Sequence, residues 1–61
     1  MPELLNEREA AIFLTLAAQT LRGWRSEGRG PGFIRLGAGK RTSIRYDRRD
    51  LQSFIEAGRV R

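Results

Sequence analysis

The chain has 61 residues, with no cysteine and no histidine. A chain of about 60 residues buries only about 60% of the surface that its unfolded state exposes, so we expect residues 1–61 to form one domain. Disulfides and Cys/His zinc sites are excluded, so one compact core must supply the stability, and we expect no metal or other cofactor.

Arginine dominates the charge of the chain. Twelve Lys and Arg against seven Asp and Glu give a net charge of +5, and every base but Lys40 is an arginine. Residues 1–21 hold one base and three acids, whereas residues 22–61 hold eleven bases and four acids. Because arginine forms planar bidentate bonds to phosphate and to guanine edges, this bias favours a nucleic-acid partner. A generally basic surface that attracts membranes or acidic proteins is the alternative.

The hydrophobic pattern gives no sign of a membrane. The first residues lack the basic and apolar regions of a secretory signal, and no apolar run approaches the roughly 20 residues that span a bilayer. We therefore expect a cytoplasmic, nucleoid-associated protein with no membrane partner.

Two helices are predicted in the first half of the chain. Asn6 can cap the first helix and Glu9 can complete a capping box, while Ala10, Ala11 and Leu14 share one face. A second helix follows over Ala17–Glu27, with Leu21 and Trp24 as its buried stripe. The short connection Thr15-Leu16-Ala17 has the length found in helix-turn-helix units, although helical hairpins without a DNA function also have it.

A β-hairpin and a third helix are predicted in the second half. Gly28 suits the end of the second helix, and Gly30-Pro31-Gly32 cannot continue it. The strands 33–36 and 43–46 flank a basic turn over 37–42; Ile34, Leu36, Ile44 and Tyr46 are expected on the core side, and Arg35 and Arg45 on the other.

Asp47 can cap the third helix, in which Leu51, Phe54 and Ile55 form the apolar stripe and after which Gly58 follows. Arg48 and Arg49 are unfavourable at a helix start, which indicates either a further anion nearby or compensation by Asp47 and Asp50. The predicted fold class is α+β: a small winged helix-turn-helix of three helices, with a two-stranded hairpin wing between the second and third helices.

The candidate site is a DNA-binding surface. Steps of 100° from Leu21 place Gln19, Arg22, Gly23 and Ser26 on the outer side of the second helix. Gln19 can pair with adenine and Arg22 with guanine, while Thr20 and Ser26 can bond a base or a phosphate. Glycine inside a helix costs about 1 kcal/mol, so Gly23 indicates either close approach of a groove wall or a tolerated surface glycine. The full predicted set is Gln19, Thr20, Arg22, Gly23, Arg25, Ser26, Arg29, Arg35, Lys40, Arg41, Thr42 and Arg45.

Catalysis finds little support in the sequence. There is no nucleotide-binding G-x-x-x-x-G-K-[ST] loop, and no carboxylate pair stands within an apolar run that would raise its pKa. Gly28, Gly30 and Gly32 follow a helix and precede a strand, the reverse of the order in a phosphate-binding loop. We expect that the protein is not an enzyme.

Four segments carry a resemblance to a known family: residues 5–14, residues 20–28, residues 30–37 and residues 44–51. Together they resemble the excisionase-like winged helix-turn-helix family, which is related to the DNA-binding head of MerR-type regulators, over nearly the whole chain. Four positions depart from the family pattern. Thr15 and Ala17 stand where the family usually has a glycine and a Ser or Thr cap, Gly23 replaces a larger polar residue, and Ile12 replaces a polar one.

The resemblance implies a second helix in the major groove, a wing on the adjacent minor groove, and a role as a phage or mobile-element excisionase. We expect copies of the protein to bind tandem sites cooperatively and to shape DNA for a site-specific recombinase, an integrase, because a single module discriminates sites poorly. A small transcriptional regulator of a mobile element is the alternative within this class. Outside it stand a basic RNA- or ribosome-binding protein, disfavoured because Phe33 and Tyr46 are expected in the core, and a protein-binding adaptor that uses Ile12 and Phe13.

Overall fold

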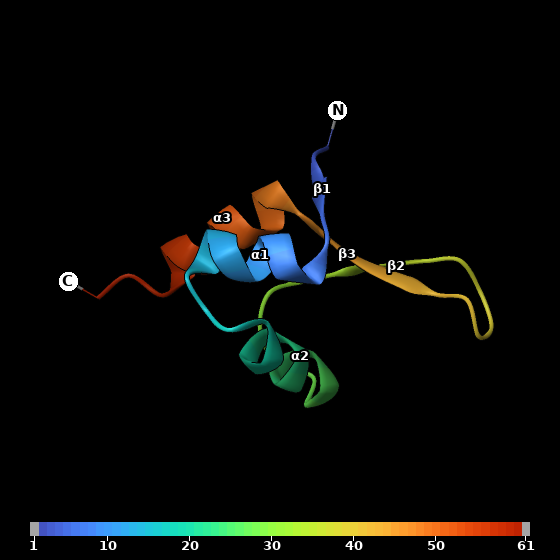
Figure 1. Cartoon of the computed structure of the whole chain (residues 1–61). Coiled ribbons are helices and arrows are strands. Elements are labelled where there is room, and N and C mark those ends of the chain that lie inside the picture. The colour runs from blue at the N-terminus through green and yellow to red at the C-terminus, as the bar shows by residue number, and fades with distance from the viewer. Residues whose placement is uncertain (1, 61) are drawn as a thin grey trace.

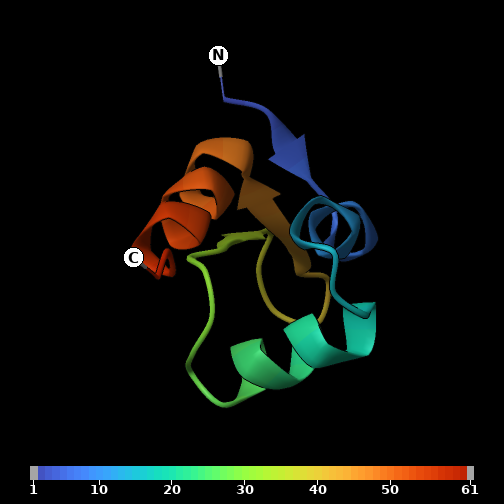
Figure 2. The same ribbon diagram turned by 90° about the vertical axis from the view of Figure 1, so that its left-hand side faces the viewer.

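The computed structural model describes residues 2–60 of the chain. The elements follow in the order β1 (Leu4–Leu5), α1 (Glu7–Leu14), α2 (Ala18–Ser26), β2 (Ile34–Leu36), β3 (Ser43–Asp47) and α3 (Arg48–Ala57) (Figure 1). The two views together show that α2 runs across α1, whereas β2 and β3 project away from the helices as a hairpin (Figures 1 and 2). The described part of the chain is therefore elongated, with extents of 43 × 28 × 18 Å.

The sheet has three antiparallel strands in the order β1-β3-β2. The first part of β3 pairs with β2, with Arg45 opposite Ile34, and its last two residues pair with β1, with Tyr46 opposite Leu5. The predicted α+β fold class is confirmed, with a hairpin before the last helix. The position of the hairpin differs, however, because β2 begins one residue later than expected and β3 extends one residue further, to Asp47.

The third strand, β1, was not predicted, and the prediction of a two-stranded sheet was wrong in this respect. A strand of two residues cannot display the period-2 alternation by which strands are recognised. The backbone pairing of β1 continues beyond the strand, where Arg48 N donates to Glu3 O at 3.0 Å. The N-terminal segment is thereby fixed against the start of α3.

The start and end of α1 follow the predicted pattern. Asn6 Oδ1 accepts from Glu9 N at 2.8 Å and Asn6 N donates to Glu9 Oε1 at 2.9 Å, so the capping box is confirmed. After α1 the chain turns at Thr15, whose φ of 57° is left-handed, and Leu16 N donates to Ala11 O at 2.8 Å. This is the Schellman ending, in which the left-handed position usually holds glycine. Thr15 therefore has a side chain at a position where the backbone conformation favours glycine.

The second helix is one residue shorter at each end than the predicted Ala17–Glu27. Ala17 occupies the N-cap position with an extended backbone and provides no side-chain hydrogen bond, so its residue type gave no start signal. The helix ends as predicted near Gly28, which has a φ of 76°, and Arg29 N donates to Trp24 O at 2.9 Å.

The core lies where the three helices meet β3. Its fully enclosed members are Ala10, Ala11, Leu21, Tyr46 and Leu51. The two alanines of α1 face Leu21 of α2 in this cluster, so small side chains permit the close crossing of the helices.

Three apolar residues depart from the predicted burial. Trp24 is half-buried and packs against Phe54, with ring centroids 5.9 Å apart. Leu36 was expected on the core side but is 42% exposed, and Phe33, which was expected in the core, is 38% exposed. Both residues lie at or beside β2, which projects with the hairpin beyond the helices that would cover it.

Local carboxylates compensate the arginines at the start of α3. Asp47 caps the helix by accepting from Arg49 N at 2.9 Å, and its other oxygen accepts from Arg49 Nη2 at 2.8 Å. Arg48 Nη1 donates to Glu3 Oε1 at 2.9 Å. Asp47 thus compensates Arg49 as one explanation expected, whereas Arg48 is paired with Glu3, a further anion 45 residues away, and Asp50 forms no ion pair within residues 2–60.

Candidate nucleic-acid interface

The cations of the described residues fall into two groups. Of the twelve bases of the chain, Arg61 lies outside the described residues, and six of the remaining eleven form ion pairs. Five have no ion-pair partner within residues 2–60, namely Arg8, Arg35, Lys40, Arg41 and Arg45. Four of these five belong to the hairpin segment 34–47, so the positive charge that remains available is concentrated there.

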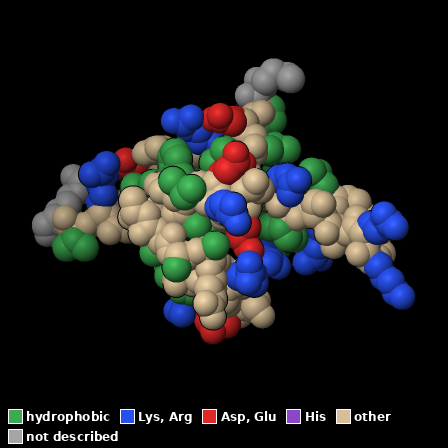
Figure 3. Space-filling model, viewed as in Figure 1, with side chains coloured by type: hydrophobic (Ala, Val, Ile, Leu, Met, Phe, Trp, Pro, Cys, Tyr) green, Lys and Arg blue, Asp and Glu red, His purple; other side chains and the backbone are tan. Residues whose placement is uncertain are grey.

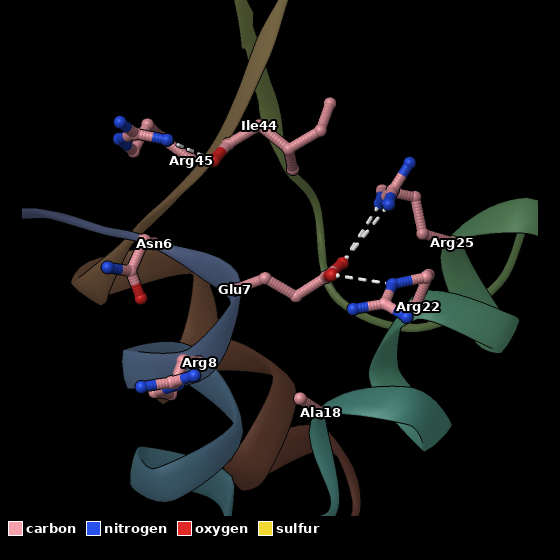
Figure 4. Close-up of a pocket in the computed structure, with 8 residues that line it drawn as sticks. All are labelled: Asn6, Glu7, Arg8, Ala18, Arg22, Arg25, Ile44 and Arg45. Atoms are coloured by element: carbon pink, nitrogen blue, oxygen red, sulfur yellow. Dashed lines mark hydrogen bonds and ion pairs between the residues drawn. The ribbon is translucent and has the colours of Figure 1, made fainter.

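An open hollow of about 550 Å³ lies beside the hairpin, between the start of α1, the inner side of α2 and β3 (Figure 4). Its lining contains four arginines and one carboxylate, and consists of Asn6, Glu7, Arg8, Ala18, Arg22, Arg25, Ile44 and Arg45. The hollow therefore carries a positive balance and joins α2 to the base of the hairpin.

Glu7 bridges α1 to two arginines of α2. Its Oε1 accepts from Arg22 Nε at 3.1 Å, and its Oε2 accepts from Arg25 Nε at 3.2 Å and from Arg25 Nη2 at 3.1 Å. The carboxylate is only 18% exposed, whereas the Arg22 side chain is 62% exposed. In Figure 4 the Glu7 side chain reaches across to α2, while Arg8 and Arg45 lie on the opposite side of it.

The two arginines are held differently by this carboxylate. Arg25 is bound through two nitrogens, is 24% exposed, and lies with its guanidinium 5.9 Å from the centre of the Phe33 ring. Arg22 is bound through Nε, and its two terminal amino groups have no hydrogen-bond partner among residues 2–60. Arg25 is thus mainly a structural residue, and Arg22 presents free donors to solvent.

The exposed polar residues of α2 lie on more than one side of the helix. Gln19, Thr20 and Ser26 are exposed and do not line the hollow, whereas Arg22 is exposed and lines it. Gly23 is half-buried, yet a side chain added there would have no atom within 4 Å, so the space above it is open. The surface of α2 therefore has open space above Gly23 and exposed polar side chains before and after it in the helix.

The hairpin carries four of the predicted cations (Figure 3). Lys40, Arg41 and Thr42 are exposed in its turn. The Arg35 guanidinium lies 5.8 Å from the centre of the Phe33 ring, and Arg45 Nη1 donates to Ile44 O at 2.8 Å. Phe33 is therefore flanked by Arg25 and Arg35, and its ring is not a bare aromatic surface.

Of the predicted residues, Arg22, Arg25 and Arg45 line the hollow and the others do not, and the hollow adds two charged residues, Glu7 and Arg8. Arg29 is absent from the lining of the hollow; it pairs with Glu27 at 2.8 Å and stacks 5.6 Å from the Trp24 ring centre. Glu7 and Arg8 were not among the predicted site residues. No local signal could have placed them here, because Glu7 meets its partners 15 and 18 residues away only once α2 crosses α1.

Tyr46 lies behind this hollow. It is 1% exposed, and its hydroxyl has no hydrogen-bond partner among residues 2–60. Burial raises the pKa of Tyr46 above its ordinary value of 10.0, the negative charge of Glu7 adds to the rise, and Arg25 opposes it.

Comparison with known proteins gives no family assignment, because no family model, no curated protein and no solved structure matches the chain. Within residues 2–60, no group of three acidic side chains is arranged to hold a metal ion. None of the helices in this part of the chain is both long enough and apolar enough to cross a bilayer.

Proposed function

We propose that the protein binds double-stranded DNA in a sequence-specific manner, as a small winged helix-turn-helix protein. One observation carries the proposal: Arg22 of the polar surface of α2 and Arg45 of the hairpin line the same open hollow, which holds four arginines and one carboxylate. Helix α2 takes the place of a recognition helix, and β2 and β3 form the wing. A helix in the major groove reads base edges, while cations beside it contact phosphates and fix the register.

The residues divide into two roles under this proposal. Gln19, Thr20, Arg22 and Ser26 contact bases or nearby phosphates, and Arg22 is the principal reader because its terminal amino groups are free to bind guanine. Arg35, Lys40, Arg41 and Arg45 hold the phosphates or lie along the minor groove. Arg25 supports Arg22 and does not itself reach the DNA.

The biological role that we propose is that of an excisionase-like protein of a phage or mobile element. Several copies bind tandem sites cooperatively and shape the DNA for an integrase. The support is the set of residues that resembles this family, together with the small size of the reading surface, because one module of this kind buries only roughly 600–1,000 Å². A titration over tandem sites that shows only independent binding would contradict the cooperative arrangement.

The roles of reader and anchor are tested by selecting preferred sites from random duplex DNA and comparing two variants with the wild type. Arg22→Ala is expected to relax the preference at one base position, by about 1–3 kcal/mol of discrimination. Arg41→Ala is expected to weaken all sequences alike. The assignment of roles would be contradicted if Arg22→Ala and Arg41→Ala changed the ratio of preferred to scrambled affinity by the same factor.

RNA binding is the second candidate, since Phe33 is more exposed than expected. Single-stranded RNA is commonly held by bases stacked on exposed aromatic rings. The two guanidiniums beside Phe33 disfavour that use of its ring. Competition between duplex DNA and structured RNA distinguishes the candidates, and we expect duplex DNA to compete more strongly.

A further inference from the structure

Glu7 is an unexpected residue in a surface proposed to meet DNA. A carboxylate repels phosphate, and this one lies in the hollow that joins the two proposed contact regions. It is nevertheless enclosed by two arginines and only 18% exposed, so it occupies a built position. A carboxylate at this position must therefore contribute to DNA recognition in a way that exceeds its repulsion of phosphate.

The bonding pattern identifies that role. Glu7 holds the Arg22 side chain through Nε and leaves both terminal amino groups of Arg22 unbound within the described residues. Bidentate recognition of guanine uses a pair of guanidinium nitrogens, and the terminal pair remains available. A carboxylate bound at Nε therefore restricts the rotation of the side chain without blocking the donors that read the base.

Arg25 fixes the carboxylate in turn. It binds Glu7 Oε2 through two nitrogens, and its guanidinium is placed beside the Phe33 ring. The order of support thus runs from Phe33 through Arg25 and Glu7 to Arg22. Such a supporting set holds a reading side chain in place before the ligand arrives, which reduces the entropy lost on binding.

We propose that Glu7 is a specificity-determining positioning residue, which orients Arg22 for base reading and at the same time disfavours binding to phosphates alone. The inference rests on the proposed DNA-binding function. The two effects are separable: orientation strengthens binding to the preferred site and so raises the ratio of preferred to scrambled affinity, whereas the negative charge weakens binding to both duplexes alike and leaves this ratio unchanged.

The test uses the full chain and compares the affinities for a preferred duplex and a scrambled duplex at one salt concentration. Glu7→Gln is expected to bind the scrambled duplex more tightly than the wild type does. Its ratio of preferred to scrambled affinity is expected to fall by roughly 2- to 12-fold, the effect of freeing one long side chain. Glu56→Gln is the matched control, because it also removes one carboxylate from an arginine ion pair, at the far end of α3. The control is expected to leave the ratio unchanged.

Two further variants separate positioning from a general structural effect. Glu7→Asp keeps the charge with a shorter side chain, so it should lose selectivity without the gain in affinity for scrambled DNA. The double variant Glu7→Gln with Arg22→Ala should show the same ratio as Arg22→Ala alone, because Glu7 acts through Arg22. Circular dichroism and thermal unfolding verify that each variant is folded.

The outcomes distinguish the two proposals. If the wild type discriminates between duplexes but Glu7→Gln and Glu7→Asp both retain its ratio, the role of Glu7 is overturned while the DNA-binding function stands. If the double variant loses more selectivity than Arg22→Ala alone, action through Arg22 is likewise overturned. If the wild type does not bind duplex DNA, the proposed function fails and the role of Glu7 falls with it.

Discussion

Tyr46 has a buried ring that packs in the core and a buried hydroxyl that forms no hydrogen bond within residues 2–60. It is among the largest fully enclosed side chains, and its ring lies 6.3 Å from that of Phe33. The phenol body contributes to the core, but the hydroxyl is buried without a partner within residues 2–60. A buried hydroxyl that lacks a hydrogen bond costs about 1–3 kcal/mol, so the ring and not the hydroxyl accounts for the stabilising contribution of Tyr46.

Replacement of Tyr46 by phenylalanine is therefore expected to leave the free energy of unfolding unchanged or to raise it by up to about 2 kcal/mol. Urea unfolding at neutral pH measures the change, with Tyr46→Leu as the control that removes the ring and is expected to destabilise. A clear loss of stability in Tyr46→Phe would show that the hydroxyl makes a favourable bond.

The raised pKa of Tyr46 predicts that the free energy of unfolding depends on pH in the alkaline range. Because the pKa of Tyr46 is raised in the folded state, folding favours the protonated phenol. This contribution to stability is complete below the ordinary pKa of 10.0 and is lost as the pH rises through the higher folded-state value. Thermal unfolding between neutral and strongly alkaline pH should show a smaller alkaline loss for Tyr46→Phe than for the wild type; equal losses would contradict the assignment.

The hairpin is the element on which the proposed anchors depend, and its turn contains two glycines with positive φ. Gly37 has a φ of 93°, and a Cβ there would overlap the carbonyl oxygen of Arg41. Gly39 has a φ of 67°, and a Cβ there would meet nothing within 4 Å. The two positions share the backbone conformation that favours glycine but differ in the space around it.

This difference provides a matched pair of variants. Gly37→Ala is expected to destabilise the protein by about 2 kcal/mol or more, since both the backbone and the contact with Arg41 are unfavourable. Gly39→Ala is expected to cost about 1 kcal/mol from the backbone alone. Urea unfolding measures both. We also expect Gly37→Ala to weaken binding to every duplex, because it displaces Lys40 and Arg41; an equal effect of the two variants would contradict this role of the turn.

At the scale of the whole molecule, the arginines that form ion pairs lie on or beside α2 and α3, and most of the cations without an ion pair within residues 2–60 lie in the hairpin. The ion pairs of Arg48, Arg49 and Arg59 gather around α3, whereas the unpaired cations lie along the hairpin and beside the hollow. Exposed ion pairs contribute little to stability. Their larger consequence here is that they neutralise part of the surface of α2 and α3, so that within residues 2–60 the unpaired positive charge lies along the hairpin and at Arg8.

The separation predicts the salt dependence of duplex binding. If the five unpaired cations neutralise phosphates, the plot of log K against log salt should have a slope of about −4.5. Arg41→Ala should reduce its magnitude by about 0.9, whereas Arg59→Ala, which removes an arginine already paired with Glu56, should change it little. Fluorescence anisotropy over a range of salt concentrations measures the slopes. A slope near zero for the wild type, or equal changes in the two variants, would contradict the electrostatic account.

Much of the fold and part of the site follow from the sequence by itself. The capping box of Asn6 and Glu9, the cap at Asp47 and the glycines after α2 act between residues close in sequence, so they locate the helices within one or two residues. Periodicity likewise identified Leu21 and Leu51 as core residues and Gln19, Arg22 and Ser26 as outward residues.

The tertiary structure decided what depends on elements far apart in the chain. The crossing of α2 over α1 brings Glu7 to Arg22 and Arg25, and it thereby determines which arginines are held and which are free. The pairing of β1 with β3 and the projection of the hairpin determine that Leu36 and Phe33 stay partly exposed. The sequence alone supplied the charge and the elements that carry it. Which arginines are paired was decided only when side chains 15 to 18 residues apart came within hydrogen-bond distance.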